Sequence, residues 1–303
     1  MEKLDFHSLD IGDRQRVEHY TLRGEGQSCD LSFANMFGWS HLYGTELAEM
    51  DGCLIVRFRA DGRLAYMSPI LPERDDVLFC RGLDAIRRDA LQWNEPYLII
   101  LDSERQRDLL VLHCGRDYEL KTERDYSDYL YLRRILQELP GKHLQGKRNH
   151  VNRFKAKYPD FTYEKLEKKD LEECLDLTRR WKAKKLVDSV RRECSDEYSV
   201  IVRIMQNWDV LEMTGGCIRV GGVMAGFTYG TPVNHSTFDV CVEKGDIRFD
   251  GVYAVLCQEF VRHLPERFEW INREEDMGLD GLRRSKESYC PERLIYKYVA
   301  EAV

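Results

Sequence analysis

The feature that most constrains the fold is an order of predicted elements that occurs on both sides of Pro140-Gly141. Before this dipeptide, the hydrophobic patterns predict two helices, two or three strands, and then helix, strand, helix and strand. After it, they predict two helices, three antiparallel strands, and again helix, strand, helix and strand. Because Pro-Gly is a strong boundary signal, we expect two similar α+β units, at residues 1–139 and 140–303.

The composition excludes several classes of protein. The 303 residues are 43% hydrophobic and 33% charged, which supports folded cores and excludes broad disorder. The net charge of −7 argues against a globally basic nucleic-acid-binding protein, but it is compatible with a local basic patch. The ten cysteines have no zinc-type spacing, so we expect free thiols and no metal site. With no signal peptide or long apolar run, we expect a cytoplasmic protein without a transmembrane segment.

A cluster of charge near the end of the chain marks the first candidate site. Residues 269–272 are a predicted strand, the charged run 273–276 follows it, and a helix begins at about residue 279. After Pro291, residues 294–299 are predicted to form one closing strand. Charge at the point where a strand gives way to a helix often belongs to a site, because the end of the sheet leaves a crevice there.

The helix after this charged run has a lysine on its apolar face. Four residues follow a 3-4-3 spacing and share one face that we expect to be buried, namely Leu279, Leu282, Lys286 and Tyr289. Tyr289 is a candidate proton donor to a leaving group, with Lys286 beside it, and Glu274, Glu275 or Asp276 is a candidate general base. The structural alternatives are a core tyrosine, a lysine that reaches the edge of the core, and a solvated acidic loop.

Two further stretches are candidates for binding an anion. Gly251 lies at the start of a helix predicted at 252–263, where backbone N–H groups and the helix dipole attract phosphate. An ordinary glycine turn is the alternative there, and Asp246 and Asp250 add negative charge nearby. Another predicted helix, at 142–157, is the most basic stretch of the chain.

The apolar face of the basic helix also contains a lysine. Its members, at 3-4-3-4 spacing, are Leu144, Lys147, Val151, Phe154 and Tyr158. Because an unpaired buried charge is costly, Lys147 needs an anionic partner, either a phosphate or an acidic residue of the other unit. The candidate substrate-binding residues on this helix are therefore Lys147, Arg148, Asn149 and His150.

Two long stretches resemble a known bacterial family. GKHLQGKRNHVNRFKAKYPDFTYEKL and INREEDMGLDGLRRSKESYCPERLIYKY resemble the DUF2156 family, which is similar to the C-terminal domain of phosphatidylglycerol lysyltransferases. CDLSFANMFGW and DYSDYLY resemble the same family, so the likeness covers nearly the whole chain. The resemblance implies two tandem GNAT-like (N-acetyltransferase-like) units, as in Fem-type peptidoglycan aminoacyltransferases. Each unit would be a mixed, mostly antiparallel sheet flanked by helices.

The resemblance also implies where a cofactor lies. In a GNAT-type unit, the pantetheine of acyl-CoA lies beside the strand matched to 238–242, and its pyrophosphate meets the helix start at 248–253. The candidate cofactor-binding residues are Asp239, Val240, Cys241, Val242, Arg248, Phe249, Gly251, Val252, Tyr253 and Asn272. The resemblance places Tyr289 where a tyrosine often protonates the CoA thiolate. We expect a splayed pair of strands to open beside Gly251 and to face the Tyr289 hydroxyl.

These observations predict an acyltransferase that moves an acyl or aminoacyl group from a CoA thioester to an amine or hydroxyl. The usual GNAT phosphate loop is absent, because DIRFDGV keeps a single glycine, and Fem-like relatives use charged tRNA as the donor. One alternative is therefore an aminoacyl-tRNA-dependent transferase with a lipid or peptide acceptor, whose helix at 142–157 contacts RNA. The other is a non-catalytic ligand-binding module. Peripheral contact with a membrane is compatible with all three, and the sequence leaves the acceptor and the oligomeric state open.

Overall fold

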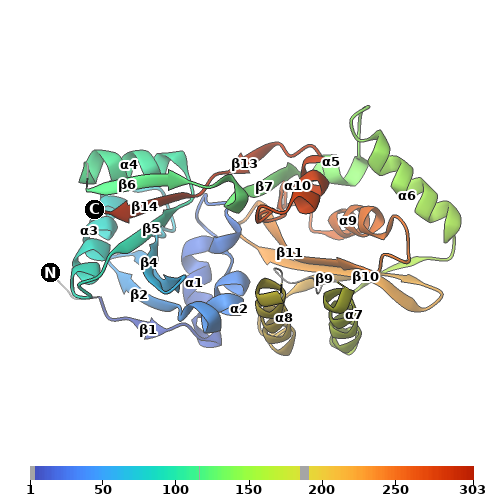
Figure 1. Cartoon of the computed structure of the whole chain (residues 1–303), viewed down its shortest axis with the longest axis horizontal. Coiled ribbons are helices and arrows are strands. Elements are labelled where there is room, and N and C mark those ends of the chain that lie inside the picture. Colours follow the sequence, from blue (N-terminus) through green and yellow to red (C-terminus); the bar gives the residue numbers. More distant parts are fainter. Residues whose placement is uncertain (1–3, 116, 185–190) are drawn as a thin grey trace.

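The computed structural model describes residues 4–115, 117–184 and 191–303, which form two seven-stranded sheets with helices on both faces (Figure 1). Each sheet contains one parallel pair, β4–β5 in the first and β11–β12 in the second, and the other pairs are antiparallel. The predicted α+β architecture of two mixed, mostly antiparallel sheets is therefore confirmed.

The strand orders are β1-β2-β3-β4-β5-β14-β6 and β13-β7-β12-β11-β10-β9-β8. The strands of the first sheet are β1 (His7–Ser8), β2 (Glu46–Met50), β3 (Cys53–Ala60), β4 (Arg63–Met67), β5 (Tyr97–Leu101), β6 (Tyr118–Thr122) and β14 (Tyr298–Ala302). Those of the second are β7 (Asp128–Leu132), β8 (Thr162–Lys165), β9 (Thr214–Val220), β10 (Val223–Pro232), β11 (Thr237–Gly245), β12 (Trp270–Asn272) and β13 (Arg293–Ile295).

The helices cover both faces of each sheet. Around the first sheet they are α1 (Arg14–Thr21), α2 (Phe33–Tyr43), α3 (Asp76–Leu91) and α4 (Glu104–Cys114). Around the second they are α5 (Arg133–Glu138), α6 (Gln145–Lys157), α7 (Leu171–Lys184), α8 (Arg191–Gln206), α9 (Val252–His263) and α10 (Asp280–Glu287). The helices α2, α3 and α4 begin with side-chain N-caps. Ser32, Asp75 and Ser103 each accept a hydrogen bond from the backbone N–H of the residue three positions later.

The two sheets exchange strands across Pro140-Gly141. β7 precedes this dipeptide but pairs with β12 and β13, whereas β14 lies between β5 and β6 of the first sheet. The prediction of one closing strand at 294–299 is wrong, because β13 and β14 belong to different sheets and the chain crosses between them. Each sheet takes one strand from the other side of residue 139, namely β14 in the first sheet and β7 in the second. The division of the chain into two units at this residue therefore stays a prediction.

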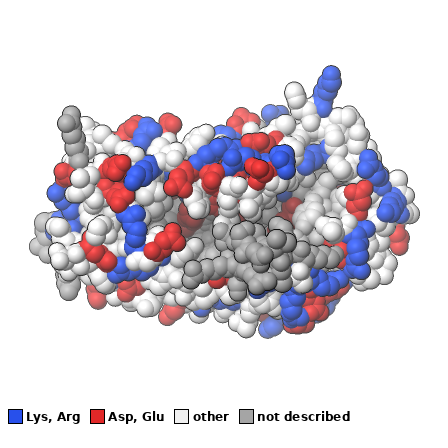
Figure 2. Space-filling model, in the orientation of Figure 1, with Lys and Arg blue, Asp and Glu red and all other residues white. Residues whose placement is uncertain are grey.

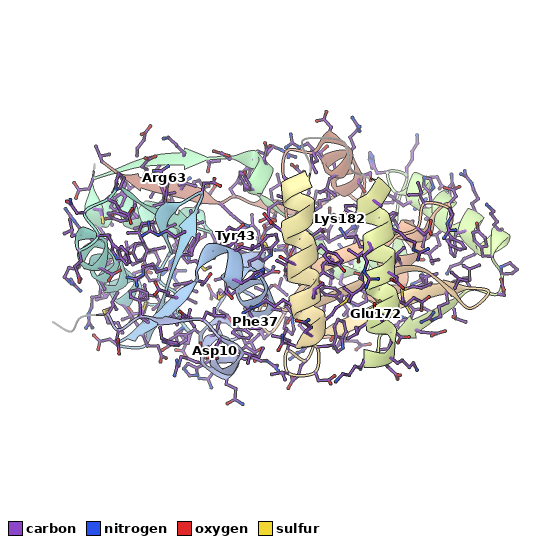
Figure 3. All side chains as sticks on the ribbon, turned by 60° about the horizontal axis from the view of Figure 1, so that its bottom comes forward. Asp10, Phe37, Tyr43, Arg63, Glu172 and Lys182 are labelled. Carbon is purple, nitrogen blue, oxygen red and sulfur yellow. The ribbon has the colours of Figure 1, made fainter. Side chains whose placement is uncertain are left out.

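One hydrophobic core runs through both units. It combines side chains of α1, α2 and the first sheet with side chains of α7, α8 and the second sheet. α8 lies between α2 and α7 in the view of Figure 3. Gly38 of α2 allows this approach, because a Cβ there would lie 2.9 Å from Val200 Cγ1. The shared core fixes the two sheets relative to each other.

A β-bulge in β11 decides which side chains point to which face of the second sheet. Thr231 pairs with Asp239 and Tyr229 with Val242, so β11 has one residue more than β10 in this interval. On one side of the bulge, Asp239 contacts Asn35 of α2. On the other side, Glu243 lies on the face covered by α9. The bulge therefore places acidic side chains on both faces.

The end of β12 opens the second sheet. β11 and β12 pair only from Thr237/Trp270 to Asp239/Asn272, and β12 stops there. Among the described residues, 240–245 of β11 consequently have no strand neighbour on this side. That the two strands splay apart here stays a prediction. α6 lies against the start of α9, since a Cβ on Gly251 would be 2.9 Å from His150 O. That Gly251 and the Tyr289 hydroxyl share one hollow stays a prediction.

We expect Gly230→Ala to unfold or strongly destabilise the protein. A Cβ at residue 230 would lie 1.8 Å from Asp239 O, and this backbone atom belongs to the bulge. Overpacking against backbone costs about 3 kcal/mol or more. Urea denaturation measures the loss, with Gly146→Ala as the control, because that position in α6 has nothing within 4 Å of a Cβ. Equal stability of the two variants would contradict this account of the bulge.

Candidate active site

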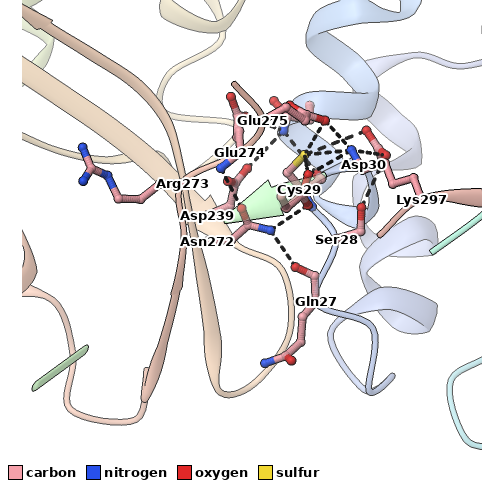
Figure 4. Close-up of polar contacts among 12 residues, drawn as sticks. Gln27, Ser28, Cys29, Asp30, Asp239, Asn272, Arg273, Glu274, Glu275 and Lys297 are labelled. Carbon is pink, nitrogen blue, oxygen red and sulfur yellow. Dashed lines mark hydrogen bonds and ion pairs between the residues drawn. The ribbon is translucent and has the colours of Figure 1, made fainter. Parts of the chain in front are cut away.

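Polar side chains from both halves of the chain meet where the two sheets join (Figure 4). They come from α2 and the segment before it, from β7 and β11, from the end of β12 and the loop after it, and from the crossing between β13 and β14. Lys297 is at the crossing and is 7% exposed. Its Nζ lies 2.8 Å from Asp30 and 3.0 Å from Asp128, and it contacts Glu275. Burial opposes its charge, but Asp128 and Asp30 raise the pKa of Lys297 well above its usual value.

Asp128 and Asn272 connect this lysine to the loop after β12. Asn272 Nδ2 donates hydrogen bonds of 2.8 Å to Asp128 Oδ2 and to the carbonyl of Gln27. Its Oδ1 accepts from the backbone N–H of Glu274 at 2.7 Å. Asn272 therefore orients the backbone at Glu274, and its predicted contact with a cofactor stays a prediction.

Glu274 and Asp239 form a pair of carboxyl groups. Asn35 Nδ2 donates to both, at 3.0 Å to each. Burial and the charge of Glu275 raise the pKa of Glu274 to about 8, while burial and Glu274 raise that of Asp239 well above its usual value. At neutral pH the pair consequently keeps at least one proton. Asp239 Oδ1 is buried and has no hydrogen-bond partner among the described residues.

The two cysteines of this region are thiols rather than thiolates. Cys29 donates to Asp128 at 3.4 Å, and Cys241 donates to Asp239 at 3.4 Å. Burial, together with these carboxylates, raises the pKa of both thiols. Neither cysteine is thus activated as a nucleophile.

Two groups at the junction contain the residue types that bind metal ions. They are Cys29, Asp128 and Glu275, and Asp239, Cys241 and Glu274. The ammonium of Lys297 already supplies the positive charge in the first group. In the second group the shared donor is the Asn35 amide, which carries no charge.

Lys286 holds the charged loop in place. Its Nζ donates to the carbonyls of Arg273 and Glu275. Burial lowers the pKa of Lys286, although Glu274 and Glu275 act in the opposite direction. Of its predicted apolar face, Lys286 and Tyr289 are buried, but Leu279 and Leu282 are 38% and 37% exposed. The prediction for those two leucines is wrong, because α10 begins only at Asp280 and is buried at its end rather than at its start.

Asp276 is not suited to be the general base. It accepts hydrogen bonds from Arg124, Arg283 and Tyr129 at 2.7, 2.8 and 2.6 Å. Burial acts against its charge, yet these donors lower the pKa of Asp276 well below its usual value. Since Glu275 is paired with Lys297, Glu274 is the remaining carboxylate of this run for a base.

Tyr289 belongs to a second cluster, on the face covered by α9. Lys147 Nζ lies 3.9 Å and Arg273 Cζ 4.7 Å from the centroid of its ring. Arg273 Nη2 is 3.2 Å from Glu243, and Figure 4 shows the Arg273 side chain pointing away from Glu274 and Asp239. The structure therefore brings Lys147 and Tyr289 together but places them apart from the carboxyl pair.

The other predicted substrate-binding residues lie outside this cluster. Arg148 donates to the carbonyls of Leu139 and Gly141, so it caps the end of α5. Asn149 accepts from Gln145, and His150 is exposed. Their contact with a substrate stays a prediction.

The predicted cofactor segment is packed by the protein itself. Arg248 donates to Asp246 at 2.9 Å, and the Phe249 ring lies against Tyr158 at 5.6 Å. Tyr253 donates to the carbonyl of Gly245 at 3.2 Å. Val240, Val242 and Val252 are buried in the cores. A role for these residues in binding CoA is untested by this packing and stays a prediction.

Sequence reasoning missed five residues of the junction, which are Cys29, Asp30, Asn35, Asp128 and Lys297. Two of them carried a signal, because Asp128 and Lys297 are charges inside otherwise apolar strand patterns, DYLYL and LIYKYV. Cys29, Asp30 and Asn35 lie in a stretch that the family resemblance includes, and no local pattern distinguishes them.

Comparison with known proteins identifies related chains. The model of the family described as phosphatidylglycerol lysyltransferase, C-terminal, matches residues 23–301. A crystal structure of a conserved protein of unknown function from Bacteroides thetaiotaomicron VPI-5482 is 35% identical, with a TM-score of 0.94, over 99% of this chain and 100% of that one.

Two more distant structures share the fold. L-PGS from Bacillus licheniformis is 14% identical with a TM-score of 0.67, over 96% of this chain and 92% of that one. A tandem GNAT protein from the clavulanic acid biosynthesis pathway is 10% identical with a TM-score of 0.50, over 99% of each chain. The expected tandem GNAT-like fold is thereby confirmed. Among the described residues, no helix combines the length and the apolarity needed to cross a membrane.

We expect Lys297→Met to destabilise the protein by about 3–5 kcal/mol, because it leaves Asp30, Asp128 and Glu275 without their shared cation. Urea denaturation measures this loss. Lys121→Met is the matched control, since Lys121 pairs with Glu301 on the surface. If the two lysine variants lose the same stability, the junction does not depend on Lys297.

Replacing Glu274 by Gln should change how stability depends on pH. Burial and the charge of Glu275 raise the pKa of the native Glu274 carboxyl to about 8, whereas the usual pKa of a glutamate is 4.5. Wild-type stability therefore declines as the pH rises between these values, and Glu274→Gln removes this decline. Melting temperatures from pH 5 to 9 should show a gap that widens up to about pH 8. The exposed-site variant Glu292→Gln should follow the wild type, and parallel curves for all three proteins would refute the raised pKa.

Proposed function

Since the chain belongs to the family of phosphatidylglycerol lysyltransferase C-terminal domains, we propose that it transfers an aminoacyl group from aminoacyl-tRNA to a hydroxyl or amine of an acceptor. The resemblance found in the sequence and the expectation of a GNAT-type transferase agree with this family. The observation that carries the proposal is the carboxyl pair of Glu274 and Asp239 at the junction of the sheets.

The carboxyl pair can take up and return the one proton that the transfer reaction moves. The acceptor oxygen or nitrogen attacks the ester carbonyl of the donor and forms the new acyl bond, while Glu274 takes the proton of the acceptor. The ester bond to the terminal ribose of the tRNA then breaks, and Glu274 returns this proton to the ribose oxygen. A pKa of about 8 suits both steps near neutral pH. Tyr289, on the other face, is not needed as the proton donor in this scheme.

The hydrogen-bond acceptors of the pair favour an aminoacyl donor over an acyl donor. An aminoacyl ester carries an ammonium group, whereas the acyl group of acetyl-CoA is neutral. Asp239 Oδ1 is buried without a partner among the described residues, so it is free to accept a hydrogen bond from such an ammonium.

Two features make CoA the less supported donor. The gap between β11 and the end of β12, which would receive pantetheine, is bridged by the ion pair of Arg273 and Glu243. The start of α9, which would meet the pyrophosphate, lies against α6, and the Asp246 carboxylate accepts a hydrogen bond from the backbone N–H of Arg248 just before it. The ion pair and α6 leave less room for CoA, and the Asp246 carboxylate adds negative charge where its pyrophosphate would lie.

Contact with tRNA would involve the basic helix α6. On the face shown in Figure 2, basic and acidic side chains are interspersed, with a dense mixed group over α10 and β7. α6 is different, because it exposes Arg153 and Lys157 and has no acidic residue of its own. RNA phosphates would be held by such a basic surface.

The test is transfer from radiolabelled lysyl-tRNA and alanyl-tRNA to vesicles that contain phosphatidylglycerol, the lipid named in the family description. Labelled lipid is the expected product, and Glu274→Gln should lower the rate by roughly a hundredfold or more. Glu292→Gln is the matched control, because this glutamate is exposed on the segment after α10.

Acetyl-CoA is tested in parallel as the donor with the same acceptors. Consumption of acetyl-CoA and none of either aminoacyl-tRNA would reverse the choice of donor. Full transfer by Glu274→Gln would reject the carboxyl pair as the site of proton transfer.

A further inference from the structure

On the face of the second sheet under α9, the described residues Arg273 and Lys147 supply two positive charges and Glu243 one negative charge. Arg273 has a side chain that is 10% exposed, and its Nη2 lies 3.2 and 3.3 Å from the two oxygens of Glu243. Its Nη1 is buried and has no hydrogen-bond partner among the described residues. One nitrogen of this guanidinium is therefore available for another acceptor.

Lys147 is the second cation. It extends from α6 to the ring of Tyr289, whose other cationic neighbour is Arg273. No carboxylate of the described residues lies within ion-pair distance of Lys147. Burial and the charge of Arg273 lower the pKa of Lys147, so the protein itself disfavours this ammonium.

The aromatic ring does not remove the need for an anion. A ring attracts a cation through its face but accepts no conventional hydrogen bond from a guanidinium or ammonium N–H. Buried cations are generally paired, because removing an ion from water is costly. Glu243 balances one of the two positive charges, and one remains.

We infer that this face holds a phosphoryl oxyanion, with Arg273 Nη1 and Lys147 Nζ as its donors. A guanidinium presents planar donors that match the oxygens of a phosphate ester, and an ammonium adds a point charge. The oxyanion site itself does not depend on the proposed function. Only the identity of the molecule that carries the phosphate rests on it. In a transfer reaction the oxyanion would be a phosphodiester of a substrate, held on the face opposite to Glu274.

The position of this oxyanion links it to the reaction site. Lys286 donates to the carbonyls of Arg273 and Glu275, so one side chain fixes both ends of the charged loop. A phosphate bound to Arg273 would therefore be held at a constant distance from Glu274, which is the next residue. Such a subsite would orient an acceptor rather than take part in proton transfer.

The test measures binding without turnover. Two probes are titrated into the protein by calorimetry at constant ionic strength: inorganic phosphate and sn-glycero-3-phosphoglycerol, a phosphodiester without acyl chains. We expect binding of the diester, weakened about tenfold or more by Lys147→Met and by Arg273→Gln. Arg284→Gln, which changes an exposed arginine of α10, should bind as the wild type does.

Each outcome decides a separate point. Binding of inorganic phosphate alone, lost in Lys147→Met, supports the oxyanion site but assigns it to free phosphate. Wild-type affinity in Lys147→Met, or no binding of either probe, overturns the inference even if Arg273→Gln fails to fold. Because neither probe requires aminoacyl-tRNA, failure of the transfer assay with intact binding would reject the proposed function and leave this site standing.

Discussion

The buried ammonium of Lys297 is the interaction on which the junction of the two sheets depends. Asp30, Asp128 and Glu275 come from distant parts of the sequence, and their charges would repel one another without it. Lys297 occupies the crossing between β13 and β14, so the same residue neutralises the acidic groups and fixes the path of the chain from one sheet to the other. Asn272 donates to Asp128 and accepts from the backbone N–H of Glu274, so it connects these ion pairs to the position of Glu274.

The β-bulge in β11 separates two kinds of chemistry. On the face of α2 lie two carboxyl groups that share a donor amide, and on the face of α9 lie two cations with one carboxylate. The contact between β11 and β12 is only three residues long, so both faces lie near the point where β12 ends. A site of this kind suits a reaction between a cationic group and an anionic one that approach from different sides.

Local patterns in the sequence predicted much of this arrangement. α9 has the predicted bounds, and the lysines on apolar faces, Lys147 and Lys286, are both drawn into buried clusters. The exchange of β7 and β14 was not predictable, because a short apolar strand has the same pattern in either sheet. Asn35 and Lys297 were missed for a related reason, since only the tertiary fold brings them to Glu274 and Glu275. Leu279 and Leu282 were predicted to be buried but are partly exposed, because helical spacing alone does not reveal where a helix begins.

The exchanged strand has a consequence for synthesis of the protein. The first sheet has a vacant place between β5 and β6 until residues 298–302 have emerged from the ribosome, although the other six strands of that sheet are complete by residue 122. Between the completion of β6 and the arrival of β14, two strand edges therefore lack their partner, a state that invites pairing with other chains. Closure of this gap by β14 also brings Lys297 to its carboxylates, so the completion of the first sheet and the assembly of the junction coincide.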